Sequence, residues 1–88
     1  MKDNYVYMLR CANGALYTGW TTDVQARLKA HNEGHGAKYT KAFGPCKLVY
    51  YEKLADKSTA LKRETEIKKM SKKQKEDLVQ SFVEDTNE

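Results

Sequence analysis

Three short runs of β-forming residues along the chain predict three strands. Residues 4–10 (NYVYMLR) place apolar side chains on both alternating faces, which is typical of a strand in the middle of a small sheet. Residues 15–20 (ALYTGW) and residues 47–54 (KLVYYEKL) are also rich in aromatic and β-branched residues. The first two runs lie close together in the sequence, so we expect them to form a hairpin.

Capping residues after the second strand predict a first helix. Thr22 and Gln25 have the spacing of a capping box, and the helix that they begin is expected to end near Gly34. Its inward side would be formed by Val24, Leu28 and Ala30 or His31. The segment from Asn32 to Pro45 then reads as a long loop with three glycines, and loops of this length are usually functional or disordered.

Two further helices are expected after the third strand. Asp56 has the residue type of an N-cap for a helix that runs to about Met70. Ser71 and Gln74 form a second capping box, which opens a terminal helix. The apolar side chains of that helix would dock on the core: Leu78, Val79 and Phe82.

The pattern therefore predicts one small α/β domain of the α+β kind. Its three-stranded antiparallel sheet is flanked by three helices in the order β-β-α-β-α-α. Residues 1–83 would form the domain, because 88 residues suffice for one modest core. Residues 84–88 are polar and acidic, and we expect them to be a disordered tail.

The length of the hairpin loop decides which side chains share a face of the sheet. A two-residue Asn13-Gly14 turn would place Tyr7 and Tyr17 on opposite faces. A three-residue loop, with Gly14 in the left-handed position of a bulge, would place Tyr7, Tyr17 and Gly19 on one face. A single site that uses both tyrosines requires the longer loop.

Charge and composition narrow the classes of partner. The net charge is +4, but residues 1–83 carry 16 basic and 9 acidic side chains, a balance of +7 that favours polyanions. The sequence contains no apolar run long enough to span a bilayer and no signal-peptide pattern, so a cytoplasmic location without membrane contact is expected. Cys11 and Cys46 match no metal-ligand spacing, and we expect two reduced, partly buried thiols.

Glu64 stands where the apolar stripe of its helix should continue. It lies four residues after Ala60 and three before Ile67, whereas Glu66 falls on an exposed face. A partly buried carboxylate is costly unless it is paired or binds a metal. Two interpretations follow: a salt bridge to Arg27 or to a lysine, and a metal-binding or catalytic carboxylate.

A set of motifs in register resembles the GIY-YIG nuclease superfamily. The set comprises Tyr5-Val6-Tyr7, Tyr17-Thr18-Gly19, Arg27 and Glu64. In detail the chain resembles the small single-domain, excision-nuclease-like branch, through the stretches LRCANGALYTG, RLKAH, GAKYT and ALKRETEIKK. It departs from the pattern at Tyr5, where the superfamily has glycine, and at Trp20, where some members carry a lysine that would contact phosphate or activate the base.

The resemblance implies a hydrolytic endonuclease that uses one Mg²⁺ or Mn²⁺ ion and acts on DNA or RNA, with DNA favoured and a role in DNA repair expected. Glu64 would hold the ion, and Arg27 would neutralise charge on the phosphate in the transition state. Tyr17 would be the better candidate for the base that activates water, with Tyr7 beside it. His31 would shuttle a proton or contact phosphate, and Gly19 would leave room for the approach of substrate or of a helix.

Basic residues outside this set predict a nucleic-acid surface. Lys38, Tyr39 and Lys41 lie in the long loop, and Lys68 and Lys72 lie near the junction of the last two helices. No sequence-reading motif is present, so selectivity would be for nucleic-acid shape or would come from a protein partner. Two alternatives remain open: a non-catalytic nucleic-acid-binding module with a vestigial site, and a protein-interaction adaptor.

Overall fold

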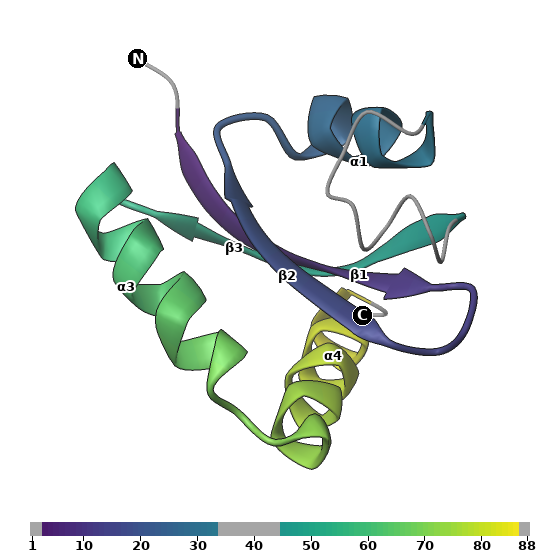
Figure 1. The fold of residues 1–88 in the computed structure, drawn as a ribbon. Coiled ribbons are helices and arrows are strands. Elements are labelled where there is room, and N and C mark those ends of the chain that lie inside the picture. Colours follow the sequence, from purple (N-terminus) through teal and green to yellow (C-terminus); the bar gives the residue numbers. More distant parts are fainter. Residues whose placement is uncertain (1–2, 34–44, 87–88) are drawn as a thin grey trace.

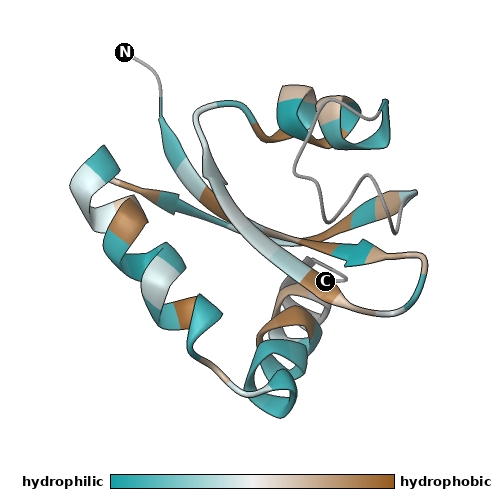
Figure 2. Cartoon of the chain, in the orientation of Figure 1, coloured by the Kyte–Doolittle hydropathy of each residue, from teal (hydrophilic) through white to brown (hydrophobic). Residues whose placement is uncertain are grey.

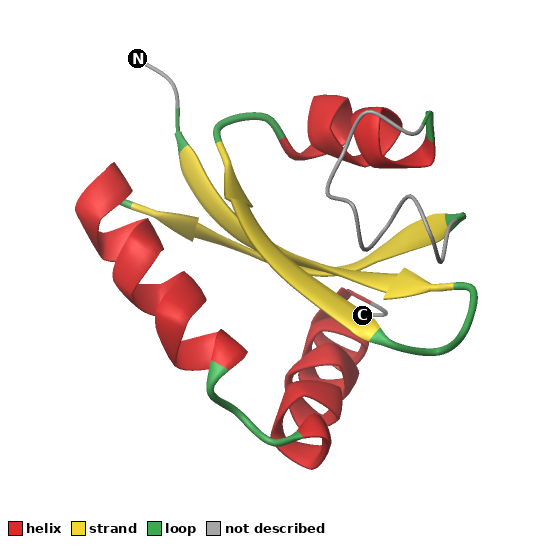
Figure 3. Cartoon of the chain, viewed as in Figure 1, coloured by secondary structure: helices red, strands yellow, loops and turns green. Residues whose placement is uncertain are grey.

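The computed structural model describes residues 3–33 and 45–86, and it confirms the predicted fold and order of elements. The described residues form three strands and three helices, which are yellow and red in Figure 3. In chain order they are β1 (Asn4–Cys11), β2 (Leu16–Thr21), α1 (Val24–Asn32), β3 (Cys46–Leu54), α3 (Lys57–Lys68) and α4 (Lys72–Thr86). Helix α4 therefore continues through Thr86. Lys38, Tyr39 and Lys41 lie outside the described residues.

The sheet is antiparallel and has the strand order β2-β1-β3, so the central strand is β1, as predicted. Tyr7 lies opposite Gly19 on β2 and opposite Tyr51 on β3. The register between β1 and β3 shifts between Met8 and Leu9, because Met8 faces Tyr50 and Leu9 faces Leu48. The extra residue, Val49, makes this a bulge, which increases the local twist of the sheet.

The hairpin has the three-residue loop. The Cys11 amide donates to the Ala15 carbonyl at 2.8 Å, and the Gly14 amide donates to the Cys11 carbonyl at 2.9 Å. Gly14 has φ 88°, a left-handed conformation that glycine adopts at low cost. With this register Leu9 faces Tyr17 and Tyr7 faces Gly19. The two tyrosines therefore share a face, as a common site requires.

Helices cover both faces of the sheet. Figure 1 shows α1 on one side, and α3 and α4 together on the other. The side under α3 and α4 holds one buried cluster: Val6, Met8, Tyr50, Ala60, Ile67 and Val79. The side under α1 holds a smaller one: Tyr7, Leu9, Cys11 and Cys46. Most of α3 is coloured hydrophilic in Figure 2, which fits a helix that packs along a narrow stripe.

The last two helices are capped and packed as the sequence predicts, whereas the first helix packs Leu28 and His31 inward as predicted but has a different N-cap. The Asp56 carboxylate accepts from the Thr59 amide at 2.8 Å, and Ser71 and Gln74 cap each other reciprocally at 2.9 and 3.2 Å. Val79 is buried on α4, with Leu78 and Phe82 packed against the same cluster.

The predicted capping box of Thr22 and Gln25 is wrong. Asp23 is the N-cap of α1, and its side chain accepts from the Ala26 amide at 3.0 Å. The Thr21 hydroxyl accepts from the Asp23 amide at 3.1 Å and so holds Asp23 in the extended conformation that a cap needs. The helix begins one residue later for this reason.

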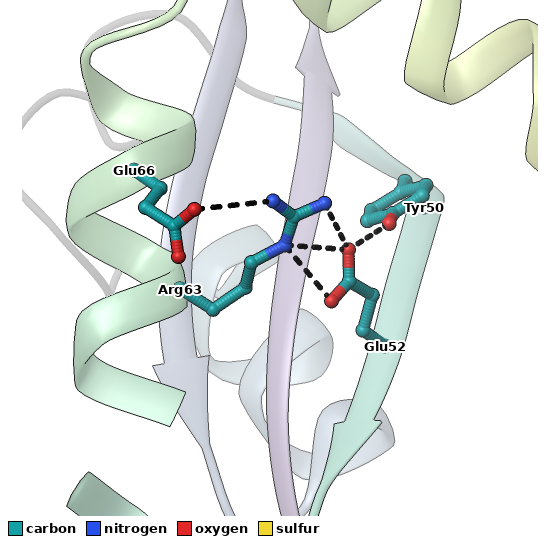
Figure 4. A network of polar contacts seen from close by, with 4 residues as sticks. All are labelled: Tyr50, Glu52, Arg63 and Glu66. Atoms are coloured by element: carbon teal, nitrogen blue, oxygen red, sulfur yellow. Dashed lines mark hydrogen bonds and ion pairs between the residues drawn. The ribbon is translucent and has the colours of Figure 1, made fainter. Parts of the chain in front are cut away.

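Two arginines join the helices to the sheet on the α3 and α4 side. Arg10 on β1 makes a two-pronged ion pair with Glu76 on α4, at 2.5 and 2.6 Å, and also donates to the Gly14 carbonyl at 3.2 Å. Figure 4 shows the second network, in which the Arg63 guanidinium on α3 contacts both oxygens of Glu52 on β3.

The carboxylate of Glu52 is the centre of that second network. Arg63 Nε lies 3.0 Å from each of its oxygens and Nη2 lies 2.9 Å from one of them, while the Tyr50 hydroxyl donates to the same group (Figure 4). The side chains of Glu52 and Arg63 are only 22% and 26% exposed. Burial, followed by the bond to Glu52, raises the pKa of Tyr50 to about 12. The network is therefore a shielded polar contact within the hydrophobic layer.

Candidate functional site

Tyr7 and His31 form the buried centre of the candidate site. Tyr7 lies on the central strand with 1% of its surface exposed, and His31 lies in the last turn of α1 with 2% exposed. Tyr7 Oη and His31 Nε2 are 3.0 Å apart. Burial, followed by the nearby charge of Arg27, lowers the pKa of His31, so the ring is neutral at neutral pH. In the tautomer protonated at Nδ1, Nε2 accepts the proton of the Tyr7 hydroxyl.

The Tyr7 hydroxyl also lies within the electrostatic reach of three other predicted site residues. Its pKa is raised to about 12, first by burial and then by Tyr17 and Glu64. Arg27 opposes the shift, as a hydrogen-bond donor and as a positive charge. Tyr17 on β2, Arg27 on α1 and Glu64 on α3 therefore all influence the ionisation of this hydroxyl, although α1 and α3 cover opposite faces of the sheet (Figure 1).

Tyr17 lies between this buried pair and the surface. Its ring centroid is 6.4 Å from that of Tyr7 and 5.1 Å from that of His31, in an edge-to-face arrangement with the histidine. The residue is half-buried, unlike Tyr7. The hydroxyl of a tyrosine in this position can contact a group in the solvent while the ring stays packed.

Gly19 makes the close packing around Tyr7 possible. A Cβ atom at this position would lie 2.5 Å from Tyr7 Oη and 2.7 Å from its Cζ, distances too short for any side chain. The group that lies closest to Gly19 is thus the Tyr7 ring, and not the substrate or helix that the sequence suggested. Any larger residue would push the Tyr7 hydroxyl away from His31.

We expect Gly19→Ala to destabilise the domain by about 1–3 kcal/mol, as overpacking of a close-packed site does. The free energy of unfolding in urea measures the cost, and the NMR shift of His31 Nε2 reports whether the Tyr7 bond survives. Gly14→Ala is the matched control, because nothing lies within 4 Å of its Cβ and its cost arises from positive φ alone. An unchanged His31 signal in Gly19→Ala would contradict the packing argument.

Arg27 and Glu64 provide the charges of the site. Arg27 is exposed on α1 one turn before His31, so its guanidinium is accessible to a phosphate. The side chain of Glu64 is 18% exposed, and Lys68 Nζ lies 3.4 Å from its carboxylate. The salt bridge to a lysine, one of the two interpretations of Glu64, is thus present. Glu66 is 65% exposed, as its position on the outer face predicted.

The donor set around Glu64 fits a weakly coordinated divalent ion. Within residues 3–33 and 45–86, no three His, Cys, Asp or Glu side chains come together as a metal-binding group. A Mg²⁺ site of the kind expected here needs only one carboxylate, with water and substrate phosphate as the other ligands. Glu64 is half-buried, and its ion-pair partner Lys68 is 54% exposed, so the chemistry of this carboxylate is compatible with such a site.

A basic groove adjoins Tyr17. It has a volume of about 340 Å³ and is lined by Leu16, Tyr17, Thr18, Lys68 and Lys75. Lys72 and Lys75 line a second hollow beside it, along with Ala15 and Leu16. The structure thus places the predicted Lys68 and Lys72 on the side of the molecule where Tyr17 emerges. Lys75 was not predicted, although its position three residues after Lys72 on one helix was a usable signal.

The family model described as the GIY-YIG catalytic domain matches residues 3–77 of this chain. The chain is 53% identical to the UPF0213 protein CPE1444 of Clostridium perfringens over 78 residues, which cover 89% of this chain and 84% of that protein. It is 49% identical to the UPF0213 protein SH2523 of Staphylococcus haemolyticus over 80 residues, 91% of this chain and 98% of that one.

Two solved structures have the same fold. The solution NMR structure of the UPF0213 protein BH0048 from Bacillus halodurans matches with a TM-score of 0.58 and 46% identity, over 89% of this chain and 83% of that one. The solution NMR structure of the protein EF2693 from E. faecalis matches with a TM-score of 0.63 and 40% identity, over 94% and 88%. In the described part of this chain, no helix is long and apolar enough to cross a membrane.

Proposed function

This chain belongs to the GIY-YIG catalytic domain family, and we propose that it is a nuclease that hydrolyses phosphodiester bonds at the site around Tyr7. The observation that carries the proposal is the contact of Tyr7 with His31 and of both rings with Tyr17, at a hydroxyl whose pKa Arg27 and Glu64 also influence. Phosphodiester hydrolysis needs a base for water, positive charge at the phosphate and stabilisation of the leaving oxygen. These five side chains include a candidate for each task.

Tyr17 is the candidate base, and Tyr7 has a positioning role. Tyr7 is buried and its pKa of about 12 keeps the hydroxyl protonated, so it is a poor acceptor of a proton from water. It instead donates to His31 and fixes the ring against which Tyr17 packs. Tyr17 is half-buried and can approach a substrate-bound water. His31, neutral and in contact with both rings, is the candidate relay for the proton.

Arg27 and Glu64 would act on the phosphate. The exposed guanidinium of Arg27 can make two parallel hydrogen bonds to the phosphate oxygens and neutralise the charge that builds on them. Glu64 would hold one Mg²⁺ or Mn²⁺ ion. Such an ion, when bound, supplies Lewis-acid polarisation of the phosphate and stabilises the leaving oxygen. Lys68 would have to release Glu64 at that moment, which its exposed position allows.

The substrate would be DNA, selected by shape rather than by base sequence. The lysines beside Tyr17, at positions 68, 72 and 75, would contact the phosphate backbone without reading bases. Lys38, Tyr39 and Lys41, which lie outside the described residues, are also proposed to contact nucleic acid. A protein partner would supply any further specificity.

One observation favours a second candidate, a nucleic-acid-binding module without catalysis. The Glu64 carboxylate already has a partner in Lys68 and does not need a metal ion to offset its partial burial. In this alternative the basic groove would bind nucleic acid, and the polar residues around Tyr7 would serve packing alone.

The experiment that separates the two candidates is cleavage of labelled branched, single-stranded and duplex DNA in Mg²⁺, in Mn²⁺ and in EDTA. We expect cleavage that EDTA abolishes and that either ion restores. Tyr17→Phe should lower the rate by about 10²–10⁴-fold, the usual contribution of a general base, and leave binding within twofold. Salt-dependent binding with no cleavage of any substrate in either ion would favour the binding module instead.

A further inference from the structure

The two cysteines form a close pair on the side of the sheet that α1 covers. Neither cysteine has a role in the proposed nuclease reaction. Both are confirmed as free thiols, and both are buried, with 3% and 4% of their surface exposed. Cys11 ends β1 and Cys46 begins β3, and the register places them directly opposite each other. Their sulfur atoms are 3.5 Å apart. We propose that Cys11 and Cys46 are a reversible redox site that forms an intramolecular disulfide.

The backbone around the pair has the geometry that such a bond needs. The Cys11 amide and carbonyl are bonded to Ala15 and Gly14 of the hairpin. The Cys46 amide donates to Asn32 Oδ1 at 2.7 Å, and its carbonyl accepts from Asn32 Nδ2 at 3.1 Å. The two cysteines therefore exchange no backbone hydrogen bonds with each other. In antiparallel sheets such non-hydrogen-bonded pairs have the closer Cα atoms, about 4.5 Å apart, which lies in the range that a disulfide spans.

The two chain segments are held in place from opposite sides, so the thiols stay close. Asn32 ties the start of β3 to the end of α1, while the Arg10–Glu76 pair and the bond from Arg10 to Gly14 fix the hairpin end of β1. The sulfur atoms must approach by about 1.5 Å to reach the bonded distance of ~2.05 Å. Rotation of the side chains accommodates a movement of this size without displacing the strands.

A hollow gives small reagents a route to the pair. It has a volume of about 500 Å³ and is lined by Arg10, Cys11, Ala12, Pro45, Cys46 and Lys47. Lys47 is exposed and adds positive charge at the opening of this hollow. A small anionic disulfide, such as oxidised glutathione, could enter there. No oxidant of protein size needs to reach the sulfurs.

The reaction balances with a small-molecule disulfide as the oxidant. One cysteine loses its proton to solvent, and its thiolate attacks the small disulfide, which forms a mixed disulfide and releases one small thiolate. The second cysteine loses its proton and attacks the protein-bound sulfur, which forms the Cys11–Cys46 bond and releases the second small thiolate. Two protein thiols are oxidised, and one small disulfide is reduced to two thiols.

The proposal is tested by intact-mass spectrometry of the folded chain after incubation with oxidised glutathione at about pH 8.5. Burial, followed by contact with Cys11, raises the pKa of Cys46 to about 11, so a mildly alkaline buffer and hours of incubation are needed. We expect a product that has lost two hydrogen atoms, carries no glutathione, resists maleimide in denaturant and returns to two thiols with dithiothreitol. Its melting temperature should exceed that of the reduced chain.

Cys11→Ser and Cys46→Ser are the matched controls, and circular dichroism checks that both are folded. Each should keep one thiol or one glutathione adduct and never lose two hydrogen atoms. Two glutathione adducts on the native chain would overturn the proposal. The proposal would also be overturned if both thiols of the folded chain stayed unreacted under conditions that oxidise the chain unfolded in guanidinium. A melting temperature of the oxidised form below that of the reduced form would overturn it as well. None of these readouts depends on nuclease activity.

Discussion

Glu64→Gln is expected to lower the cleavage rate by about 10²–10³-fold, the loss that follows removal of one electrostatic group from a transition state. Glutamine keeps the size of the side chain at position 64, but it removes the charge proposed to bind the divalent ion. The fold should persist, because the partner that loses its ion pair, Lys68, is 54% exposed and can turn to solvent. The measurement is single-turnover cleavage of labelled DNA over a titration of Mn²⁺.

Glu66→Gln is the matched control for this prediction. The residue lies two positions along the same helix, its side chain is 65% exposed, and its ion pair with Arg63 spans 3.8 Å. It should retain the full rate and the same dependence on metal. If Glu64→Gln cleaves as fast as Glu66→Gln, Glu64 is only half of a salt bridge and the metal must be bound elsewhere.

Arg63→Met is expected to destabilise the domain by about 2–3 kcal/mol, which would be the largest effect of a single substitution away from the site. In the native chain the Arg63 guanidinium contacts both oxygens of the Glu52 carboxylate, which is 22% exposed (Figure 4). The substitution removes the guanidinium and leaves the Tyr50 hydroxyl as the remaining partner in this network. A shielded charge that has lost its partner costs more than the pair contributes when intact. Urea denaturation followed by circular dichroism gives the free energy of unfolding.

Lys62→Met controls for the loss of a positive charge from α3, since Lys62 is the exposed neighbour of Arg63, and it should change stability by less than about 0.5 kcal/mol. The double variant Glu52→Gln with Arg63→Met completes the thermodynamic cycle and should recover part of the loss. Equal costs for Arg63→Met and the double variant would show that Glu52 was not stabilised by its contact with Arg63.

Local patterns in the sequence were sufficient for the fold, but they left the register of the hairpin open between two loops. Gly14 suits either loop, because both need a residue with positive φ at that position, and the three-residue loop that the structure shows is the one that places Tyr7 and Tyr17 together. The misplaced cap at Asp23 shows where such reasoning fails. Thr22 and Asp23 are both good capping residues, and a contact from Thr21 outside the helix selected the second.

The contacts between distant segments could not be read from the sequence. The meeting of Cys11 with Cys46, and of Glu52 with Arg63, follows from the sheet order and from the packing of α3 on it. Nothing in the spacing of those residues indicates either pair. Glu64 was predicted only in part. The apolar stripe of its helix predicted that the carboxylate is partly buried, but it did not identify the residue that pairs with it, which the structure shows to be Lys68.

In α1, whose nine residues are all described, His31 is the buried side chain, and Leu28 is half-buried against the same side of the sheet. The ring that helps to anchor α1 to the sheet is therefore also the ring that contacts both tyrosines. A substitution at position 31 would change the packing of α1 and the surroundings of Tyr7 and Tyr17 together. Packing alone would therefore keep a group of similar shape and polarity at position 31, whether or not the site is catalytic.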